Sequence, residues 1–423
     1  MKYFNKTKRF NLLVAFAALI ILATSCNKEL EQIPAAVVTT PTGETLDKVL
    51  QGNADDNLYY ELVVRGGQVN MINNNNLFTM FVPNNLGMKV FINAASGGLI
   101  PLNAPDAYFS GFIANYLTVD QAAAIVKYNT MPQVITSASI PNVFPNFYYP
   151  STFNPAPGVS ALARLDVYPS TRNAIVPGVI YGWLNNIPIT GVDQMASNGV
   201  IHHTATLVTP NSRTLWDRIS TESDLTYLKA AIETADIGAA PGSTLQGYLS
   251  QFGPDFTVFA PVDTAFKSFI VNLLVANSVP EFIANIIVTN YGTILLTNPS
   301  SIPVIGPLIA QQITPTNVKG ILVYHVLGHR AFTNNFPTTE TAYPTLLNSG
   351  LPTHPGVKLN ATFGIVPGLP FPIVTSATVK DVRNNVANIF INTQPLTPDP
   401  YGTSDQNFLN GTLNKISAVL SPQ

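Results

Sequence analysis

Charged side chains are scarce in this sequence. Asp, Glu, Lys and Arg make up 10% of its 423 residues, against about 25% in an average soluble protein. The net charge is −2, and no basic run follows the N-terminal region. Because neutralisation of phosphates by several Lys and Arg supplies most nucleic-acid affinity, we expect no nucleic-acid partner.

Cysteine is nearly absent, since Cys26 is the only one. One thiol excludes an intramolecular disulfide and a cysteine-rich zinc site. After the leader, the sequence also lacks an apolar run of the roughly 20 residues that span a bilayer. Residues 268–288 come nearest, but polar residues and a proline interrupt them. We therefore expect no membrane-spanning helix.

Apolar residues, proline and glycine are abundant. Apolar residues make up 46% of the chain, which also has 34 Pro and 27 Gly. Disordered chains combine low hydrophobicity with high net charge, so disorder is disfavoured. Solvation by neutral side chains and many turns favours a loop-rich extracellular protein that contains β-structure. The length predicts two or three domains.

The N-terminus has the pattern of a signal peptide. Lys2, Lys6, Lys8 and Arg9 precede an apolar stretch over residues 12–22, which small residues follow up to Cys26. A basic start, a short apolar core and small residues indicate a secretory leader over residues 1–25. The residues before Cys26 resemble a bacterial lipobox, with Ala23 where Leu is usual. We predict lipid attachment at Cys26; the alternative is an ordinary secretory signal with an incidental cysteine.

Residues 26–40 are interpreted as a linker. Its stretch from Lys28 to Glu31 resembles the surface-export signal of Bacteroidetes lipoproteins. Several acyl chains on one cysteine would hold the protein stably on a membrane. We therefore predict an outer-membrane lipoprotein of the cell envelope, exposed at the surface, with the membrane as a partner through Cys26.

One pattern occurs twice in the rest of the chain. Residues 256–266 have a looser counterpart at 78–88, and apolar residues at helical spacing precede each copy, starting near Thr214 and Thr45. Each copy closes with Asn-Gly and an apolar stretch that runs to a proline, over 198–210 and 410–422. The repeat predicts two domains, 41–210 and 211–423.

The centre of each copy predicts a strand, a stop and a helix. The residues before Pro83 and Pro261 are β-branched or apolar, as in a short buried strand. Proline ends such a strand because it cannot continue a central ladder. Asn85 and Asp263 are favourable N-cap residues, so we expect each to begin a helix.

These residues resemble the fasciclin (FAS1) family. The second copy matches the first family signature closely, at Thr257, Val258, Phe259, Ala260, Pro261, Asp263, Ala265 and Phe266. It also matches the second signature at 321–327, including the Tyr324-His325 pair, and the resemblance implies that this stretch is mostly strand or turn. The first copy is more divergent, with Gly87, Met88 and Asn129 in place of Ala, Phe and His. The resemblance implies an α+β fold with two tandem fasciclin-like domains, each a β-sandwich-like wedge with helices packed on one side.

Both copies are longer than a typical fasciclin module. The additional residues lie mainly at 268–316, 333–372 and 141–177, and 268–288 is interpreted as an extra helical insert. Long loops often carry binding function. Phe144, Phe147, Tyr148, Tyr149 and Phe153 alternate with prolines in the 141–177 insertion. Tyr148 and Tyr149 are candidate contacts for a protein or glycan ligand; the alternative is a small core that fixes the loop.

Tyr324 and His325 are the other binding candidates. In animal members of the family, this region is associated with receptor binding, so the resemblance implies an adhesive surface. The alternative is a packed pair whose histidine is satisfied by hydrogen bonds. His325 and His329 share a helix or strand face, but no Glu-x-x-His motif accompanies them, so we expect no metal and no cofactor. Of His202 and His203, we expect one packed and one solvated.

The sequence favours a non-catalytic function. It has no Gly-x-Ser-x-Gly elbow and no phosphate-binding glycine loop before a helix. The leading hypothesis is a cell-surface adhesion or ligand-binding lipoprotein. An alternative is an accessory glycan-binding subunit of an outer-membrane uptake system. An unrecognised hydrolase is the third hypothesis.

Overall fold

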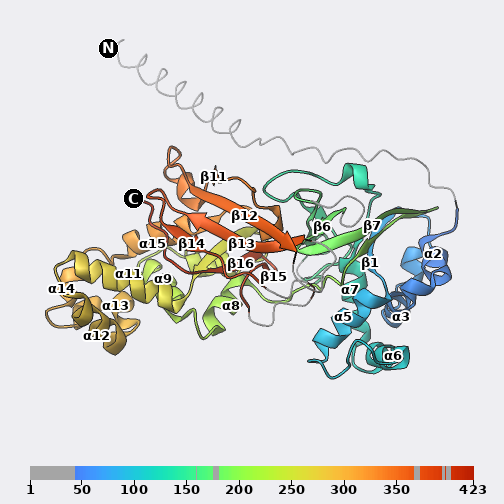
Figure 1. Ribbon diagram of the computed structural model, residues 1–423, viewed down its shortest axis with the longest axis horizontal. Helices are drawn as coiled ribbons and strands as arrows, with labels where there is room; N and C mark the ends of the chain where they lie inside the picture. Colours follow the sequence, from blue (N-terminus) through green and yellow to red (C-terminus); the bar gives the residue numbers. More distant parts are fainter. Residues whose placement is uncertain (1–42, 159, 175–180, 366–371, 393–395, 397–401) are drawn as a thin grey trace, which may run out of the picture. The chain divides into compact units, whose positions relative to one another are not determined.

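The computed structural model describes residues 43–423 except 159, 175–180, 366–371, 393–395 and 397–401. The predicted leader, Cys26 and the 26–40 linker lie outside the described residues. Residues 40–423 form one compact unit. Its helices and sheets confirm the α+β class (Figure 1). No described helix is both long and apolar enough to cross a membrane.

The elements before residue 210 fall into helices followed mainly by strands. The helices are α2 (Leu46–Gly52), α3 (Asn57–Arg65), α4 (Val69–Ile72), α5 (Asn85–Ala95), α6 (Asp106–Asn115) and α7 (Val119–Tyr128), with 3-10 turns at Ala54–Asp56 and Ser137–Ser139. The strands are β1 (Phe78–Pro83), β2 (Thr130–Met131), β3 (Tyr149–Pro150), β4 (Asp166–Val167), β5 (Pro169–Ser170), β6 (Gly182–Leu184), β7 (Ile187–Ala196) and β8 (Gly199–Thr204).

The elements after residue 210 follow a similar order. The helices are α8 (Leu215–Thr221), α9 (Thr226–Ala235), α10 (Leu245–Ser250), α11 (Asp263–Ala276), α12 (Glu281–Tyr291), α13 (Ile294–Thr297), α14 (Gly306–Ile309) and α15 (Pro315–Tyr324), with 3-10 turns at Pro299–Ser301, Thr333–Asn335 and Leu346–Ser349. The strands are β9 (Phe256–Pro261), β10 (Val326–Leu327), β11 (Thr341–Tyr343), β12 (Val357–Ile365), β13 (Pro372–Lys380), β14 (Val386–Asn388), β15 (Gln406–Phe408) and β16 (Gly411–Ile416).

The same strand arrangement is found in two sheets. One sheet has the order β2-β1-β8-β7-β6-β5, and another has the order β10-β9-β16-β15. β1 runs parallel to β8 with Phe78 opposite Gly199, and β9 runs parallel to β16 with Phe256 opposite Gly411. The prediction that buried strands end at Pro83 and Pro261 is confirmed. The proposed domain boundary at residue 210 stays a prediction.

Two glycines allow these parallel pairs to form. A Cβ on Gly199 would lie 2.2 Å from the carbonyl oxygen of Phe78, and one on Gly411 would lie 2.3 Å from that of Phe256. The preceding Asn198 and Asn410 accept hydrogen bonds from the backbone N–H of Leu46 and Leu215, at 2.7 and 2.9 Å. The Asn-Gly pair therefore joins the closing strand of each copy to its first helix.

The core lies on both faces of the repeated sheets. In the second copy, one apolar cluster joins the β9–β16 face to α8, α9, α11 and α15. A second cluster fills the space between the other face and the separate sheet β11-β12-β13-β14, through Phe259, Ile416, Leu359 and Val379. The first copy likewise has a helical cluster around β1 and a second cluster around β3 and β4. Figure 1 shows β12 and β13 lying across β16.

The prediction that Asn85 and Asp263 cap their own helices with their side chains is wrong. Asn85 accepts a bond from the backbone N–H of Leu58 at 3.0 Å, and Asp263 accepts one from that of Tyr227 at 2.9 Å. Each side chain therefore satisfies a free N–H at the start of the neighbouring helix, α3 or α9. Their own helices, α5 and α11, begin at these residues, and Asn84 caps α5. Sequence spacing indicates only local partners, which is why these bonds were missed.

Two further expectations have definite outcomes. The stretch 321–327 was expected to be mainly strand or turn, but most of it belongs to helix α15, which ends at Tyr324. The apolar face of this helix packs on α9, so tertiary contacts outweigh its β-branched residues. The helical insert over 268–288 is confirmed, as the end of α11 and most of α12.

Candidate functional site

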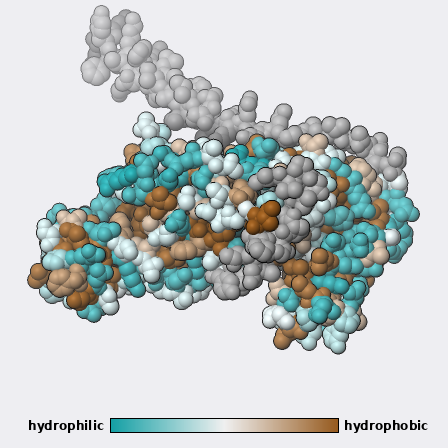
Figure 2. Space-filling model, viewed as in Figure 1, coloured by the Kyte–Doolittle hydropathy of each residue, from teal (hydrophilic) through white to brown (hydrophobic). Residues whose placement is uncertain are grey.

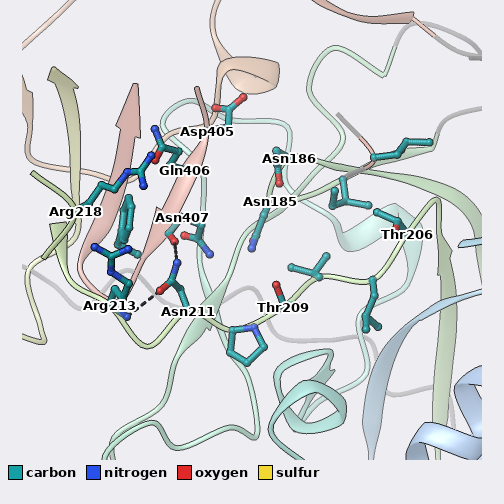
Figure 3. A pocket seen from close by; sticks show the side chains of 16 residues that line it. Asn185, Asn186, Thr206, Thr209, Asn211, Arg213, Arg218, Asp405, Gln406 and Asn407 are labelled. Atoms are coloured by element: carbon teal, nitrogen blue, oxygen red, sulfur yellow. Dashed lines mark hydrogen bonds between the residues drawn. The ribbon is translucent and has the colours of Figure 1, made fainter. Parts of the chain in front are cut away.

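A polar pocket lies where residues of both copies meet (Figure 3). Its volume is about 260 Å³. Its walls come from four segments: the β6–β7 turn, the chain after β8, helix α8 and strand β15. The lining residues are Asn185, Asn186, Ile187, Thr206, Leu207, Val208, Thr209, Pro210, Asn211, Arg213, Arg218, Leu396, Asp405, Gln406, Asn407 and Phe408.

Local structure positions the polar side chains of this pocket. Asn185 occupies the turn between β6 and β7 with a φ of 54°, a conformation that Asn tolerates better than most residues. Asn211 donates to the carbonyl oxygen of Asn407 at 2.8 Å and accepts from the backbone N–H of Arg213 at 2.8 Å. Arg213 in turn donates to the carbonyl oxygen of Asp217. The floor of the pocket is thus held by hydrogen bonds and not by apolar packing alone.

Two donors at this pocket are buried without a partner. They are Nε of Arg218 and Nε2 of Gln406, and Figure 3 shows both side chains on one wall. The outer end of the Arg218 guanidinium is occupied, because Nη2 lies 2.6 Å from Glu222. An unmade hydrogen bond at a buried donor costs about 1–3 kcal/mol. The wall is therefore suited to a ligand that supplies oxygen acceptors.

A buried polar cluster supports the pocket from below. The amides of Asn185 and Asn407 both donate to the hydroxyl of Tyr128, at 3.1 and 3.2 Å. Asn407 also accepts from Arg330, which is 2% exposed and lies 2.6 Å from Asp255. These side chains come from both copies, so the geometry of the pocket depends on their junction.

Several other buried hydrogen bonds cross the same junction. The backbone N–H of Phe332 donates to the side chain of Asn146 at 3.1 Å, and Ser170 donates to Asn335 at 3.1 Å. Asn173 donates to the carbonyl oxygens of residues 334 and 336, both at 2.8 Å. The two copies are therefore joined by specific polar contacts over a wide area.

The structure places Tyr324 and His325 in the interior. The hydroxyl of Tyr324 donates to the carbonyl oxygen of Gly356 at 2.8 Å. Nδ1 of His325 lies 2.8 Å from the carbonyl oxygen of Ile321, and Nε2 accepts from the backbone N–H of Leu420 at 2.9 Å. Nδ1 must then carry the proton, so the ring is neutral with both nitrogens satisfied. A contact made by these side chains themselves would require them to leave the core.

Asn129 occupies the corresponding position in the first copy. Its amide donates to the carbonyl oxygen of Ile125 at 2.9 Å and to that of Val208 at 2.6 Å. His325 likewise contacts the carbonyl four residues earlier and the chain after the closing strand. The replacement of His by Asn therefore keeps a tie between helix and closing segment, which is a structural role.

The two candidate tyrosines of the 141–177 insertion face different environments. Tyr148 is 55% exposed and its ring lies 5.7 Å from that of Phe147. Tyr149 is only 3% exposed and belongs to the apolar cluster around β3 and β4. Strand β3 begins at Tyr149, which packs in that cluster, so of the two only Tyr148 is available for contact. Its binding role stays a prediction.

His202 and His203 have separate partners. Nε2 of His202 lies 2.7 Å from the carbonyl oxygen of Ile135, and this ring is buried. His203 is partly exposed and lies 3.6 Å from the buried carboxylate of Asp56. Within the described ranges, no three His, Cys, Asp or Glu side chains are grouped as a metal would need.

Burial shifts two pKa values in opposite senses. Burial lowers the pKa of His325 to about 4. Burial, with the nearby charge of Asp255, raises the pKa of Asp166 to about 6, although Arg330 opposes this. The unfolded values are about 6.5 for His and 3.9 for Asp. His325 stays neutral in the folded protein, so it lowers the unfolding free energy as pH falls from about 6.5 to 4. Asp166 binds its proton earlier in the folded protein than in the unfolded chain, so it raises the unfolding free energy as pH falls from about 6 to 4.

We expect single variants to reveal these two opposing contributions. Each shift exceeds two pKa units, so at about 1.4 kcal/mol per unit each contributes about 3 kcal/mol. In Asp166→Asn the unfolding free energy should fall more steeply than in the wild type between pH 6.5 and 4. In His325→Asn it should fall less steeply or rise. Urea unfolding across this range measures both, and identical slopes in all three proteins would contradict the assignment.

Sequence reasoning missed the pocket residues. Arg213, Arg218, Gln406 and Asn407 come from segments about 190 residues apart, so no spacing rule brings them together. One usable signal existed in the Asn185-Asn186 pair between two short apolar stretches, which predicts a hairpin turn. A second usable signal was that charged residues are scarce in this sequence. An arginine close to an expected core needs a partner for its charge.

Comparisons with known proteins give limited similarity. No protein-family model matches the chain, and no curated protein matches it. Among solved structures, it is similar to a FAS1 domain pair from the insect cell adhesion molecule Fasciclin I, with 12% identity and a TM-score of 0.30. The match covers 88% of this chain and 98% of that one. At this TM-score the overlap does not establish a shared fold, and the architecture above rests on this chain's own strands and helices.

Proposed function

We propose that this chain is a non-catalytic ligand-binding or adhesion protein of the cell envelope. The signal-peptide pattern and the single cysteine support a lipid anchor at Cys26 and a surface location. The pocket between the two copies is its proposed ligand site. The single observation that carries this assignment is the pair of unpartnered donors on Arg218 and Gln406.

The side chains of the pocket define the class of ligand. Asn185, Asn211 and Asn407 supply amides, and Arg213 and Arg218 supply positive charge. Such a wall favours a polar ligand rich in hydroxyl or carboxylate oxygens, because each such oxygen can accept from these donors. Saccharides have this chemistry. Leu207, Val208 and Phe408 add apolar surface for the carbon face of such a ligand.

A second candidate is an accessory glycan-binding subunit of an uptake system. The exposed ring of Tyr148, stacked on Phe147, is the observation that favours it. An aromatic ring that is already held in place can stack on a sugar at low entropic cost. In this case, the main contact would lie on the 141–177 insertion and not in the pocket.

One binding experiment separates the two sites. The full chain is applied to an array of neutral and uronic-acid oligosaccharides, together with the variants Arg218→Met, Gln406→Leu and Tyr148→Ala. If the pocket is the site, the first two variants should each weaken binding at least about tenfold, because each removes an unshared donor of a buried hydrogen bond. Loss confined to Tyr148→Ala would favour the accessory role.

Arg164→Met is the matched control. Arg164 is exposed and donates to the carbonyl oxygens of Ala161 and Ala163 in its own loop, outside the pocket. Its replacement should leave binding unchanged. Absence of binding to every saccharide, or equal loss in the control, would refute the assignment of this pocket to saccharides.

A further inference from the structure

One segment of each copy exposes many large apolar side chains. It lies between the strand-ending proline and the helix of the second signature, and comprises α5 and α6 in the first copy and α11 to α14 in the second. We call these segments the helical lobes. Their exposed apolar side chains are Leu86, Leu99, Leu102, Tyr108 and Tyr116 in the first lobe and Val275, Phe282, Ile286, Tyr291, Ile294, Val304 and Leu308 in the second.

The lobes carry almost no net charge. In the second lobe, from α11 to α14, the charged residues are Asp263, Lys267 and Glu281. Between 86 and 119 the charged residues are Lys89 and Asp106, which pair with each other at 2.6 Å. Neither lobe can therefore attract a partner through an excess of one sign of charge.

Helix α12 shows how the surface of the second lobe is built. Phe282 is 68% exposed and Ile286 is 52% exposed, and their spacing of four residues places them on one face. Ala284, Ile287 and Val288 on the other face are buried in the core. The outer side of the helix thus presents two large apolar side chains next to the exposed polar residues Glu281, Asn285 and Thr289. Figure 2 shows brown side chains over both lobes, at the lower left and the lower right.

We propose that the helical lobes contact the surface of a lipid bilayer. Exposed Phe, Ile, Leu and Tyr side chains enter the boundary between headgroups and acyl chains favourably, and Tyr suits that boundary because only its tip is polar. A surface without net charge suits zwitterionic lipid. The inference rests on the proposed anchor for one step, the proximity of the membrane.

The short segment between Cys26 and the described unit supports a lipid bilayer as the partner of the lobes. Residues 27–42 connect Cys26 to the described unit, and sixteen residues span at most about 55 Å when extended. A lipid on Cys26 would keep the start of the described unit, at residue 43, within this distance of a bilayer. The resulting high effective concentration lets a weak contact at the lobes persist.

Tryptophan placed on the second lobe gives a direct test. The full lipidated chain is reconstituted with phosphatidylcholine vesicles that contain a brominated phosphatidylcholine, which quenches nearby tryptophan. In Phe282→Trp we expect at least about twofold stronger quenching of the added residue than in Leu351→Trp. Leu351 is 53% exposed and lies outside both lobes. The native Trp183 and Trp216 contribute the same background to both proteins.

Each outcome has a definite meaning. Equal quenching in the two variants would overturn the proposal while leaving the anchor intact, provided that the protein floats with the vesicles. If Cys26→Ala abolishes flotation of an otherwise folded chain, the anchor is supported. If that variant still floats, contacts other than the lipid hold the chain on the vesicles, and quenching at position 282 decides whether the lobes make them.

A second measurement addresses a competing occupant. Sedimentation without vesicles would show a dimer if the lobes paired with another copy of the chain. A dimer that dissociates in Phe282→Ser would overturn the lipid assignment. A monomer in both proteins, with the Phe282→Ser chain bound at least about tenfold more weakly to vesicles in the Cys26→Ala background, supports it.

Discussion

Replacing Gly411 with alanine should destabilise the protein by at least about 3 kcal/mol. The added Cβ would lie 2.3 Å from the carbonyl oxygen of Phe256 and 2.9 Å from Cδ1 of Leu215. The carbonyl belongs to the parallel partner strand and cannot move without breaking the β9–β16 ladder. Overpacking against side chains costs typically 1–3 kcal/mol, and a backbone neighbour yields less than a side chain does. Urea unfolding of the purified variant measures the loss.

Gly320→Ala is the control for this prediction. Gly320 lies in α15 with no atom within 4 Å of an added Cβ. Alanine is a better helix former than glycine, so this variant should be stabilised by up to about 1 kcal/mol. Gly199→Ala, at 2.2 Å from the carbonyl oxygen of Phe78, should behave like Gly411→Ala. If Gly411→Ala unfolds like the control, the close approach of the parallel strands is not required for the fold.

Replacing Arg330 with methionine should cost about 3–5 kcal/mol. Arg330 is buried, bonds to Asp255 and Asn407, and lies 4.9 Å from the ring centre of Tyr168. Tyr168 also donates to Asp255 at 2.8 Å. Methionine fills similar space but removes the charge-assisted hydrogen bonds to Asp255 and to the side-chain oxygen of Asn407. Hydrogen bonds to charged groups contribute about 1.5–3 kcal/mol each.

A double-mutant cycle isolates the ion pair. Asp255→Asn alone should also destabilise the protein, and the double variant should lose less than the sum of the two single variants. Lys358→Met is the matched control, because Lys358 pairs with Glu340 at 3.4 Å on the surface. Exposed ion pairs contribute about 0–1 kcal/mol, so this change should be small. Equal losses for Arg330→Met and Lys358→Met would show that the buried cluster does not hold the junction.

The sequence predicted the parts of the fold that depend on local signals. Apolar runs that stop at Pro83 and Pro261 are visible without any partner, and so are the helices that begin after Thr45 and Thr214. The role of Asn85 and Asp263 was predicted wrongly because their partners, Leu58 and Tyr227, lie 27 and 36 residues away. Residue type indicated a cap, but only the packing of two helices decides which helix receives it.

The candidate site was less predictable than the fold. Tyr148 and Tyr149 looked equivalent in sequence, and the direction of one short strand separates them. Asn407 contributes to the pocket because it bonds to Tyr128, 279 residues earlier. No periodicity carries information over such a distance. Sequence patterns indicated which segments are long enough to carry function, whereas the junction between the copies determines which side chains meet.

The hydrogen bonds that cross the junction also bear on how the protein would respond to mechanical load. The proposed anchor and ligand site would place the chain under tension between the membrane and the bound ligand. Because Tyr128, Asn146 and Ser170 each bond to residues more than 160 positions further along the chain, tension on either copy is shared by the other. Under tension, the hydrogen bonds across the junction should therefore break first. Until they break, the two copies should bear the load together.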